Sequence, residues 1–453
     1  MNHRATRDLR LDALARVEGE AALHLRVDGD TVTETRLRIY EPPRFFEALL
    51  TGRGHTEPPD ITARICGICP VAYQMSACRA IEDACGVTVD GPLAELRRLL
   101  YCGEWIESHA LHIHLLHAPD FLGCADVVEL ARRDRAAVER GLRVKQTGNA
   151  ILEQLGGRPV HPVNVRVGGF YRTPAPDELR PLAERLRRAR EEALDTVRWV
   201  AAFDFPDAVC EHDLLALREP GRYAVASGTP AVLAAGERGA GERGGQPREF
   251  PLSDFEQRVR EGQVPHSTAL TATLDGRRHL TGPLARWAIS GRWLHPVAVE
   301  AAREAGLGDP LTGAVCDNPF RSIVVRAVEV VQAVEEALRI IERYERPDRP
   351  AVEVRPRRGT GAGATEAPRG LLYHRYSLTE DGTLSGARIV PPTSQNQAAI
   401  EEDVRRAAQA RLRVAGPAAD DEELARLCER AIRNHDPCIS CATHFLDVTV
   451  RRT

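Results

Sequence analysis

Two Cys-x-x-Cys pairs, one near each end of the chain, constrain the fold of this sequence more than any other feature. Cys66 and Cys69 lie in Arg-Ile-Cys-Gly-Ile-Cys, and Cys438 and Cys441 lie in Asp-Pro-Cys-Ile-Ser-Cys. Each pair can aim two sulfurs at one metal, so four thiolates result if the pairs meet. Cys69 and Cys438 are 369 positions apart, whereas a structural zinc site of this kind usually closes over about 15 to 20 residues. We therefore expect a metal site that ties the two ends of the chain together.

The sulfurs restrict the kind of metal without choosing one. Thiolates select soft or borderline metals such as nickel, iron, copper and zinc over magnesium or calcium. A thioredoxin-type redox pair is a weaker interpretation, because neither pair lies in the strand-to-helix context that such a site needs. A redox-active metal centre and a structural zinc site are both open on the sulfurs alone.

The other seven cysteines stand alone on patterned segments. An odd total of eleven cysteines, in a chain without a signal peptide, argues against a disulfide framework. A free cysteine behaves as a small hydrophobic residue, so we expect a buried structural thiol at each position. The positions are Cys78, Cys85, Cys102, Cys124, Cys210, Cys316 and Cys428.

Composition indicates an ordinary globular chain without an excess of positive charge. Of 453 residues, 43% are hydrophobic and 28% are charged, and the net charge is −4. A substantial core can form, whereas nucleic acid and anionic membranes are not favoured partners. No run of eighteen apolar residues occurs and residues 1–10 are polar, so we expect neither a membrane span nor a signal peptide. The expected location is the cytoplasm.

Hydrophobic periodicity predicts a mainly α fold with a small N-terminal β-sheet, in the α+β class. Residues 15–40 alternate in polarity around Asp28-Gly-Asp30, which predicts a hairpin within a sheet region at 15–60. Helical periodicity then dominates. We expect helices over 45–50, 71–84, 93–117, 127–155, 177–203, 318–344, 396–414 and 421–433. One domain spanning 1–453 is expected.

Two stretches depart from this helical pattern. Residues 207–294 shift to short strands and turns, and we interpret them as an insertion rich in loops. Within it, the Gly/Arg-rich piece 236–245 predicts a surface loop. A second flexible stretch is expected at 355–363.

Motifs spread along nearly the whole chain resemble those of nickel-iron hydrogenase large (alpha) subunits. The two cysteine signatures match, and the second is complete through His444. The resemblance implies the helical fold of that family and reversible cleavage of H2 into protons and electrons. Three further matching segments are Arg16-Val-Glu18-Gly19, the stretch 156–169 from Gly-Gly-Arg-Pro-Val-His to Val-Gly-Gly, and Glu366-Ala-Pro368-Arg369-Gly370.

The resemblance also implies a role for each cysteine. Cys66 and Cys438 are then terminal ligands of nickel, and Cys69 and Cys441 bridge nickel to an iron that carries carbon monoxide and cyanide. Carbon monoxide and cyanide need a hydrogen-bond donor and an apolar environment. Arg369 and Pro368 are expected to supply these, with Asp436 in the surrounding layer.

Proton transfer and a second metal site follow from the same resemblance. Glu18 matches the family's proton-relay glutamate, and Arg369 is an alternative base close to the metals. Glu47, the carbonyl of Ile389 and His444 correspond to ligands of magnesium or a similar divalent ion. An imidazole is less typical of such an ion.

The sequence departs from the family pattern at two positions. Tyr73 stands where many members have histidine, and Ser108 stands where others have an aspartate. Nearby histidines share a helix but not one face, so we interpret them as structural or supporting residues. They are His109, His112, His114 and His117.

Three segments resemble the cytoplasmic, bidirectional branch that couples H2 to NAD(P) through separate subunits. They are Cys-Gly-Ile-Cys-Pro-Val-Ala-Tyr-Gln-Met-Ser-Ala (66–77), Asp317-Asn-Pro-Phe-Arg-Ser322 and Pro392-Thr-Ser-Gln-Asn396. No Gly-x-Gly-x-x-Gly follows a strand, so this chain is not expected to bind NAD(P) itself. It also lacks spare cysteine motifs for iron-sulfur clusters. We expect a small subunit that carries such clusters, and flavin and iron-sulfur subunits beyond it. Residues 445–453 are a possible tail cleaved after His444.

Two other interpretations stay open at this point. One is a non-catalytic relative like the quinone-site subunit of respiratory complex I, although that relative lacks the four cysteines. The other is a structural subunit held together by zinc.

Overall fold

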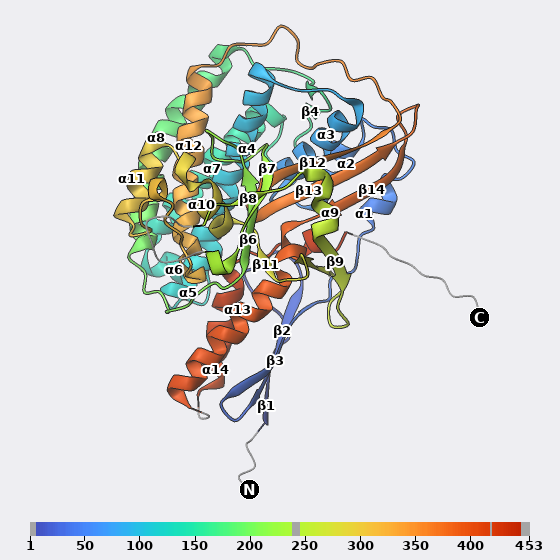
Figure 1. The fold of residues 1–453 in the computed structure, drawn as a ribbon. Coiled ribbons are helices and arrows are strands. Elements are labelled where there is room, and N and C mark those ends of the chain that lie inside the picture. The colour runs from blue at the N-terminus through green and yellow to red at the C-terminus, as the bar shows by residue number, and fades with distance from the viewer. Residues whose placement is uncertain (1–5, 238–244, 417–418, 445–453) are drawn as a thin grey trace, which may run out of the picture.

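Figure 1 shows a layer of helices on one side of the molecule and several small sheets on the other. The computed structural model describes residues 6–237, 245–416 and 419–444. The expected α+β class is confirmed, but the sheets are more numerous than the single N-terminal sheet predicted. Within the described part, no helix is long and apolar enough to cross a membrane.

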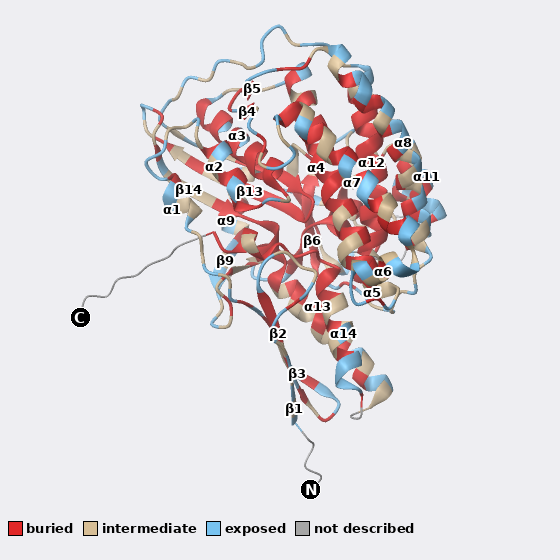
Figure 2. Ribbon diagram, turned by 180° about the vertical axis from the view of Figure 1, so that it is seen from behind, coloured by how far each residue is buried: buried red, intermediate tan, exposed pale blue. Residues whose placement is uncertain are grey.

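The helical layer is built around α12 (Ser322–Glu342), which packs against α4 (Gly91–Leu111) and α8 (Pro176–Ala201). Almost every residue of α12 is buried. Its charged residues can lie inside because they are paired, as Glu329 is with Arg286 at 2.7 Å. α7 (Arg135–Gly156) packs along the other side of α4. Figure 2 shows α4 and α12 as mostly buried, whereas exposed residues recur along α7 and α8.

The predicted helices are found, with one break and one irregular end. The helix expected over 127–155 is divided into α6 (Val127–Arg133) and α7, because the Asp134 carboxylate accepts from Ala137 N (3.0 Å) and starts a new helix. The helix expected over 93–117 ends in a π-helical turn at His112–His117, followed by the short α5 (Ala118–Phe121).

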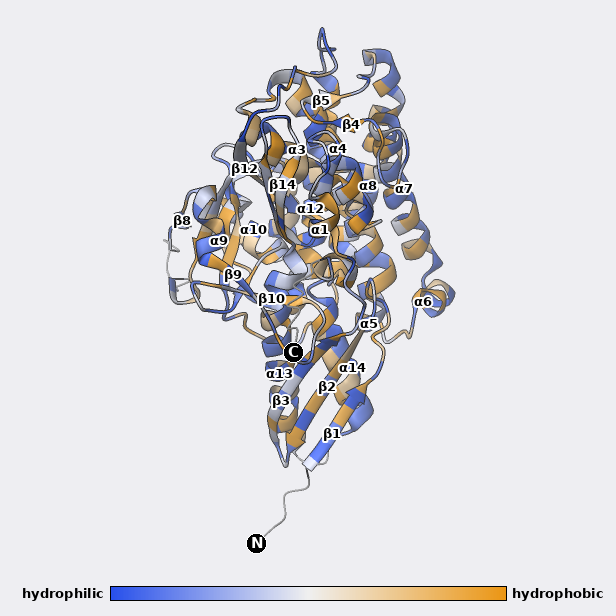
Figure 3. Ribbon diagram, turned by 90° about the vertical axis from the view of Figure 1, so that its right-hand side faces the viewer, coloured by the Kyte–Doolittle hydropathy of each residue, from blue (hydrophilic) through white to orange (hydrophobic). Residues whose placement is uncertain are grey.

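The N-terminal hairpin is confirmed and extended by a strand that we did not predict. β2 (Ala21–Asp28) and β3 (Thr31–Ile39) form the hairpin, and β1 (Thr6–Leu11) pairs antiparallel with β2. Figure 3 shows hydrophobic and hydrophilic residues alternating along these strands. Their apolar face is covered by α13 (Pro392–Ala415) and α14 (Asp421–Arg433).

A second three-stranded sheet was missed by the sequence analysis. β12 (Gly359–Ala367), β13 (Gly370–Leu378) and β14 (Leu384–Val390) form an antiparallel sheet, so the stretch expected to be flexible at 355–363 is partly a strand. β12 packs on α3 (Pro70–Cys85). Gly361 allows this contact, since a Cβ there would lie 2.1 Å from Ala84 N.

The segment 207–294 contains strands that belong to the core. β6 (Asp213–Arg218), β7 (Thr229–Leu233), β8 (Arg248–Glu249) and β11 (His279–Leu280) form one sheet, and β9 (Val259–Gln263) pairs with β10 (Leu270–Leu274). Leu214 and Ala216 are wholly buried against the helical core. The expected short strands are present and pack inward, which a loop-rich segment would not do. Most of the expected loop at 236–245 lies outside the described residues.

The remaining short helices connect these layers. They are α1 (Phe46–Leu50), α2 (Pro58–Thr62), α9 (Phe255–Arg258), α10 (Pro283–Ser290), α11 (Pro296–Glu304) and α15 (Ile439–Ala442). The first cysteine pair precedes α3. In the second pair, Cys438 directly precedes α15 and Cys441 lies within it. The core therefore brings the two ends of the chain together at one point.

Candidate metal centre

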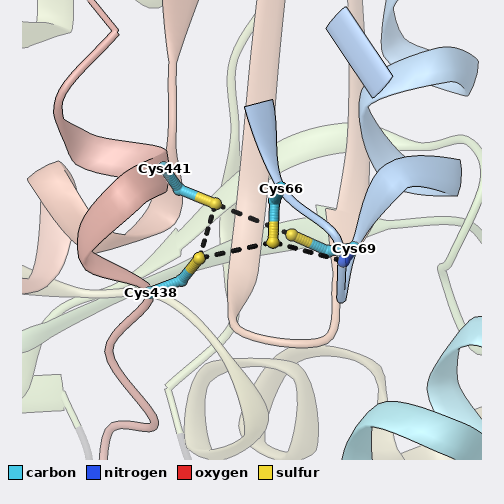
Figure 4. Close-up of side chains that lie close together, drawn as sticks. All are labelled: Cys66, Cys69, Cys438 and Cys441. Atoms are coloured by element: carbon cyan, nitrogen blue, oxygen red, sulfur yellow. Dashed lines mark hydrogen bonds between the residues drawn. The ribbon is translucent and has the colours of Figure 1, made fainter. Parts of the chain in front are cut away.

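The two distant cysteine pairs converge on one buried point (Figure 4). Cys66 Sγ lies 3.5 Å from Cys438 Sγ, and Cys69 Sγ lies 3.7 Å from Cys441 Sγ. All four sulfurs fall within 4.8 Å of one another, and no side chain of the four is more than 2% exposed. Four soft donors in this arrangement can hold a metal or a small metal cluster.

Polar contacts hold the two cysteine loops together from both sides. The guanidinium of Arg44 donates to the carbonyls of Ile65 and Ser440, one from each loop. The buried carboxylate of Glu104 accepts from Val71 N (2.6 Å) and Ala72 N (3.1 Å) at the start of α3. These contacts fix the backbone that carries the sulfurs, so the site is preorganised.

Glu18 lies directly beside the second cysteine pair. Its Oε2 is 2.9 Å from Cys438 Sγ and accepts from Ser440 N at 3.1 Å. Its backbone carbonyl accepts from Ile439 N, which makes a short bridge between the two chain ends. A carboxylate so placed can exchange a proton with the Cys438 sulfur.

Arg369 is buried at the same centre. It donates from Nε to the Asp436 carbonyl (2.8 Å) and from Nη2 to the Asp436 carboxylate (3.2 Å). Burial opposes the charge of Arg369, but Asp436 and the sulfurs of Cys438 and Cys69 outweigh burial and raise its pKa. Its Nη1 is buried without a hydrogen-bond partner in the described part of the chain. The carbonyl of Pro368 accepts from Arg286.

The four thiols cannot all ionise without a compensating cation. Burial raises the pKa of the Cys438 thiol, and the neighbouring Cys441 and Cys66 thiols raise it further. Hydrogen bonds from Cys438, Cys441 and Cys69 lower the pKa of the Cys66 thiol. A bound metal would supply the positive charge that four thiolates require.

The three residues expected to hold a hard divalent ion also lie together. His444 Nε2 is 2.8 Å from the Ile389 carbonyl oxygen and 3.8 Å from Glu47 Oε1. Glu47 Oε1 accepts from Ile389 N at 2.8 Å. Sequence analysis missed Glu261, a fully buried carboxylate whose pKa is raised by burial and which pairs with Arg388 (2.7 Å). Nothing in its polar segment Val-Arg-Glu-Gly-Gln indicated that it would be buried.

The two departures from the family pattern are both buried. Burial and the charges on Cys441 and Cys69 raise the pKa of Tyr73, whose ring lies 5.6 Å from that of His374. Ser108 is wholly buried, and its hydroxyl makes no hydrogen bond to other described residues.

The histidine cluster does not form a metal site. Among the described residues, the only group of three or more His, Cys, Asp and Glu side chains placed to hold one metal ion is the four cysteines. His112 Nε2 bonds to the Arg433 carbonyl (2.8 Å), and His109 Nε2 lies 3.0 Å from the Glu329 carboxylate. His114 stacks on Trp199. These contacts join the helix that carries the histidines to α14, α12 and α8.

All seven isolated cysteines are buried, as predicted. Burial raises the pKa of four of their thiols to about 12, namely those of Cys78, Cys102, Cys316 and Cys428. Such thiols are poor nucleophiles and poor ligands at neutral pH.

The fold and the four converging thiols define a protein built around a buried metal centre of soft donors. Residues 44–143 and 321–444 match the family model described as nickel-dependent hydrogenase. The alpha subunit of sulfhydrogenase 1 from Pyrococcus furiosus is 32% identical over 445 residues, covering 96% of this chain and 97% of that protein. The alpha subunit of sulfhydrogenase 2 from the same organism is 33% identical over 442 residues, covering 97% and 99%.

Solved structures agree with these matches. The crystal structure of an NAD+-reducing [NiFe]-hydrogenase in the H2-reduced state has a TM-score of 0.86 and 27% identity, covering 97% of this chain and 100% of that one. A [NiFeSe]-hydrogenase of Dm. baculatum has the same fold, with a TM-score of 0.78, 22% identity and coverage of 97% and 100%. The chain therefore belongs to the nickel-dependent hydrogenase family, in which it is a large (alpha) subunit. It is an oxidoreductase that acts on H2.

Proposed function

We propose that this chain cleaves and forms H2 reversibly at a nickel-iron centre, and passes the electrons through a partner iron-sulfur subunit to NAD(P). The observation that carries this proposal is the convergence of four buried sulfurs beside Glu18 and Arg369. The resemblance of the chain to an NAD+-reducing hydrogenase supports NAD(P) as the final acceptor. The expected cytoplasmic location is compatible with that acceptor.

The residues present fit a nickel-iron centre with diatomic ligands. Cys66 and Cys438 would hold nickel, and Cys69 and Cys441 would bridge nickel to iron. When bound, this centre supplies the site at which H2 is split into protons and electrons. Arg369 offers an unused, buried N–H to iron-bound carbon monoxide or cyanide, and the Pro368 side of the same turn is apolar.

Glu18 is the proposed first acceptor of the proton. Its carboxylate lies 2.9 Å from the Cys438 sulfur, which is within the reach that general acid-base transfer needs. It is only half-buried, so a proton held at Oε2 can leave toward solvent or toward the small subunit. Arg369 keeps its charge through Asp436 and is better suited to holding an anionic ligand than to accepting a proton.

Glu47, the Ile389 carbonyl and His444 are the proposed ligands of magnesium or a similar divalent ion. Two of the three donors are oxygens, as such an ion prefers, and Glu261 adds a buried carboxylate nearby. The ion would hold the segment that ends at His444 against Ile389 of β14. Cleavage of residues 445–453 after His444 is part of this proposal, and that tail lies outside the described residues.

The loop at 158–163 offers a docking face for the small subunit. Val160 and Val163 are 45% and 49% exposed, although both are apolar. The loop lies on the first cysteine loop, because His161 Nδ1 bonds to the Ala63 carbonyl (2.8 Å) and Val160 lies 4.0 Å from a Cβ built at Gly67. An iron-sulfur subunit covering this face would bury exposed apolar surface close to the metal centre.

Infrared spectroscopy of the purified complex, with metal analysis, tests the proposal. Bands from iron-bound carbon monoxide and cyanide, with nickel and iron both present, are expected. Zinc in place of both metals, without such bands, would refute it in favour of a structural zinc site. NAD(P)-dependent H2 oxidation should require the partner subunits, and full activity of the isolated chain in H2-driven dye reduction would contradict the heteromeric assembly.

A further inference from the structure

One buried carboxylate holds two arginines close to the point where the chain ends meet. The side chain of Asp120 on α5 is 7% exposed and accepts from Arg16 Nη2 at 2.5 Å. It also accepts from Nε and Nη2 of Arg433, the last residue of α14, at 2.7 Å and 3.0 Å. Two-pronged contacts of this kind fix orientation as well as distance. The carboxylate therefore joins three segments that are far apart in the sequence.

The Arg16 side of this cluster leads directly to Glu18. Residues 12–20 connect β1 to β2 and belong to neither strand. Arg16 has a φ of 60°, a left-handed conformation that a residue with a side chain keeps only where its surroundings hold it. Its guanidinium provides that hold, because Nη2 donates to Asp120 and Nη1 donates to the Leu116 carbonyl at 2.7 Å. Asp120 thus fixes the chain two residues before Glu18.

Arg433 attaches the same segment a second time. Its Nη1 donates to the Ala15 carbonyl at 2.7 Å, three residues before Glu18, while its Nε and Nη2 contact Asp120. The Arg433 side chain is 2% exposed, and a buried charge that loses its partner is strongly destabilised. Loss of the Asp120 charge should therefore weaken the contact with Ala15 as well.

The segment that leads to Cys438 has anchors outside this cluster. The carbonyl of Arg433 is bonded to His112 Nε2 at 2.8 Å. The carbonyl of Asn434 accepts from the hydroxyl of Ser322 at 2.8 Å. Loss of the cluster should therefore release the N-terminal side and leave the cysteine side in place.

The distance that the cluster controls matters for proton transfer. Glu18 Oε2 lies 2.9 Å from Cys438 Sγ, and acid-base transfer needs heavy atoms about 2.6 to 3.2 Å apart. A displacement of about 1 Å can lower a reaction rate by about 10²-fold. Burying three charged side chains also costs desolvation energy that apolar packing would avoid, so attachment of the segment alone does not call for this cluster.

We propose that Asp120 is a positioning residue, which holds Glu18 at proton-transfer distance from the Cys438 sulfur through Arg16 and Arg433. The proposal rests on the proposed function, in which Glu18 accepts the proton from the metal centre. Asp120 touches no reacting atom and exchanges no proton. It acts by fixing the backbone just before Glu18.

Asp120→Asn in the assembled complex tests this role. The rate of H2 oxidation should fall by at least about ten-fold, because Glu18 moves away from the sulfur. Nickel and iron content and the infrared bands of the metal centre should stay at wild-type values, since the cysteine side keeps its own anchors. Glu429→Gln is the matched control, because Glu429 pairs with the same Arg433 at 3.0 Å but from four residues earlier on the same helix, and its rate should not change.

A double substitution separates positioning from general support of the fold. In a Glu18→Gln background, adding Asp120→Asn should change the residual rate by less than about two-fold, because residues that act through one another are not additive. An Asp120 that only supports the fold would lower the rate by the same factor in both backgrounds. That result would overturn the proposal.

Amide hydrogen exchange gives a readout that does not need turnover. The amides of Ile439 and Ser440 donate to the carbonyl and the carboxylate of Glu18, so peptides that contain them report whether Glu18 is in place. Asp120→Asn should speed their exchange by at least about ten-fold. Arg16→Gln leaves the contact between Asp120 and the other arginine intact and should have the same effect.

Three results would overturn the positioning role. They are wild-type exchange of the two amides in Arg16→Gln, loss of the metals in Asp120→Asn, and a rate in Asp120→Asn within about three-fold of wild type. If Asp120→Asn does not assemble, the amide exchange of Arg16→Gln decides. If Glu18→Gln alone leaves the rate unchanged, Glu18 is not the proton acceptor and that part of the proposed function fails, whereas amide exchange still decides whether Asp120 positions Glu18.

Discussion

Gly361→Ala tests how closely the metal centre depends on the contact between β12 and α3. A Cβ at this position would lie 2.1 Å from Ala84 N and 2.3 Å from the Ala80 carbonyl oxygen. Backbone atoms cannot rotate away, so α3 must move by about 1.4 Å to bring Ala84 N to an ordinary contact distance near 3.5 Å. Overpacking of this kind costs about 1 to 3 kcal/mol, and we expect the upper end of that range.

The displacement should also reach the metal centre. Cys69 is the residue immediately before α3, and functional groups must be held within about 0.5 Å of their working positions. We therefore expect the nickel and iron content of the purified complex to fall several-fold. The apparent midpoint of thermal unfolding should fall by about 3 °C for a chain of this size.

Gly386→Ala on the adjacent strand β14 is the matched control. The nearest atom to its added Cβ is Ser377 Cβ, at 4.0 Å, so stability should change by less than about 0.5 kcal/mol. Wild-type metal content and unfolding temperature in Gly361→Ala would refute the reasoning. Equal damage from both substitutions would show that the effect does not come from the contact with α3.

Three further predictions concern other parts of the chain. Glu18→Gln should keep the infrared bands of the metal centre but lower the rate of H2 oxidation by about 10²- to 10⁴-fold, which is the usual contribution of a positioned acid or base. A loss below three-fold would exclude Glu18 as the main proton relay. Burial alone would raise the pKa of Asp403, but hydrogen bonds from His212 and His435 outweigh it and lower the pKa to about 2. Asp403→Asn should therefore lower the free energy of unfolding by about 2 kcal/mol at neutral pH. The difference between the variant and the wild type should vanish as the pH falls from about 4 toward 2, because the Asp403 carboxylate becomes protonated. A difference that does not change with pH would contradict the lowered pKa of Asp403. Val160→Asp should prevent co-purification with the small subunit while leaving the thermal unfolding of the chain unchanged, and an intact complex would move the docking face elsewhere.

The sequence predicted the helical part of the fold well and the sheets poorly. Amphipathic segments of more than ten residues carry a clear 3.6-residue period, and α14 was placed at its observed bounds. β12, in contrast, has the sequence Gly-Thr-Gly-Ala-Gly-Ala-Thr-Glu-Ala, which lacks the β-branched alternation of an ordinary strand. It forms a strand because α3 packs on it, and this tertiary cause is invisible in a local pattern.

The residues of the candidate site were found because they lie in short motifs. The convergence of the cysteine pairs was expected from their spacing and resemblance, and the geometry places Glu18 and Arg369 beside them. Glu104 and Glu261 were missed, since a buried carboxylate looks like any surface carboxylate until its neighbours are known. Their environments depend on contacts between elements far apart in the sequence.

The use of both chain ends at one centre has a consequence for the order of synthesis. When Cys66 and Cys69 leave the ribosome, they form only half of the ligand set, and Glu18 has no partner. The other half emerges after more than 360 further residues have been translated. A nascent or truncated chain therefore cannot assemble the four-cysteine site. The site becomes complete only after the polypeptide between its two halves has been translated and folded.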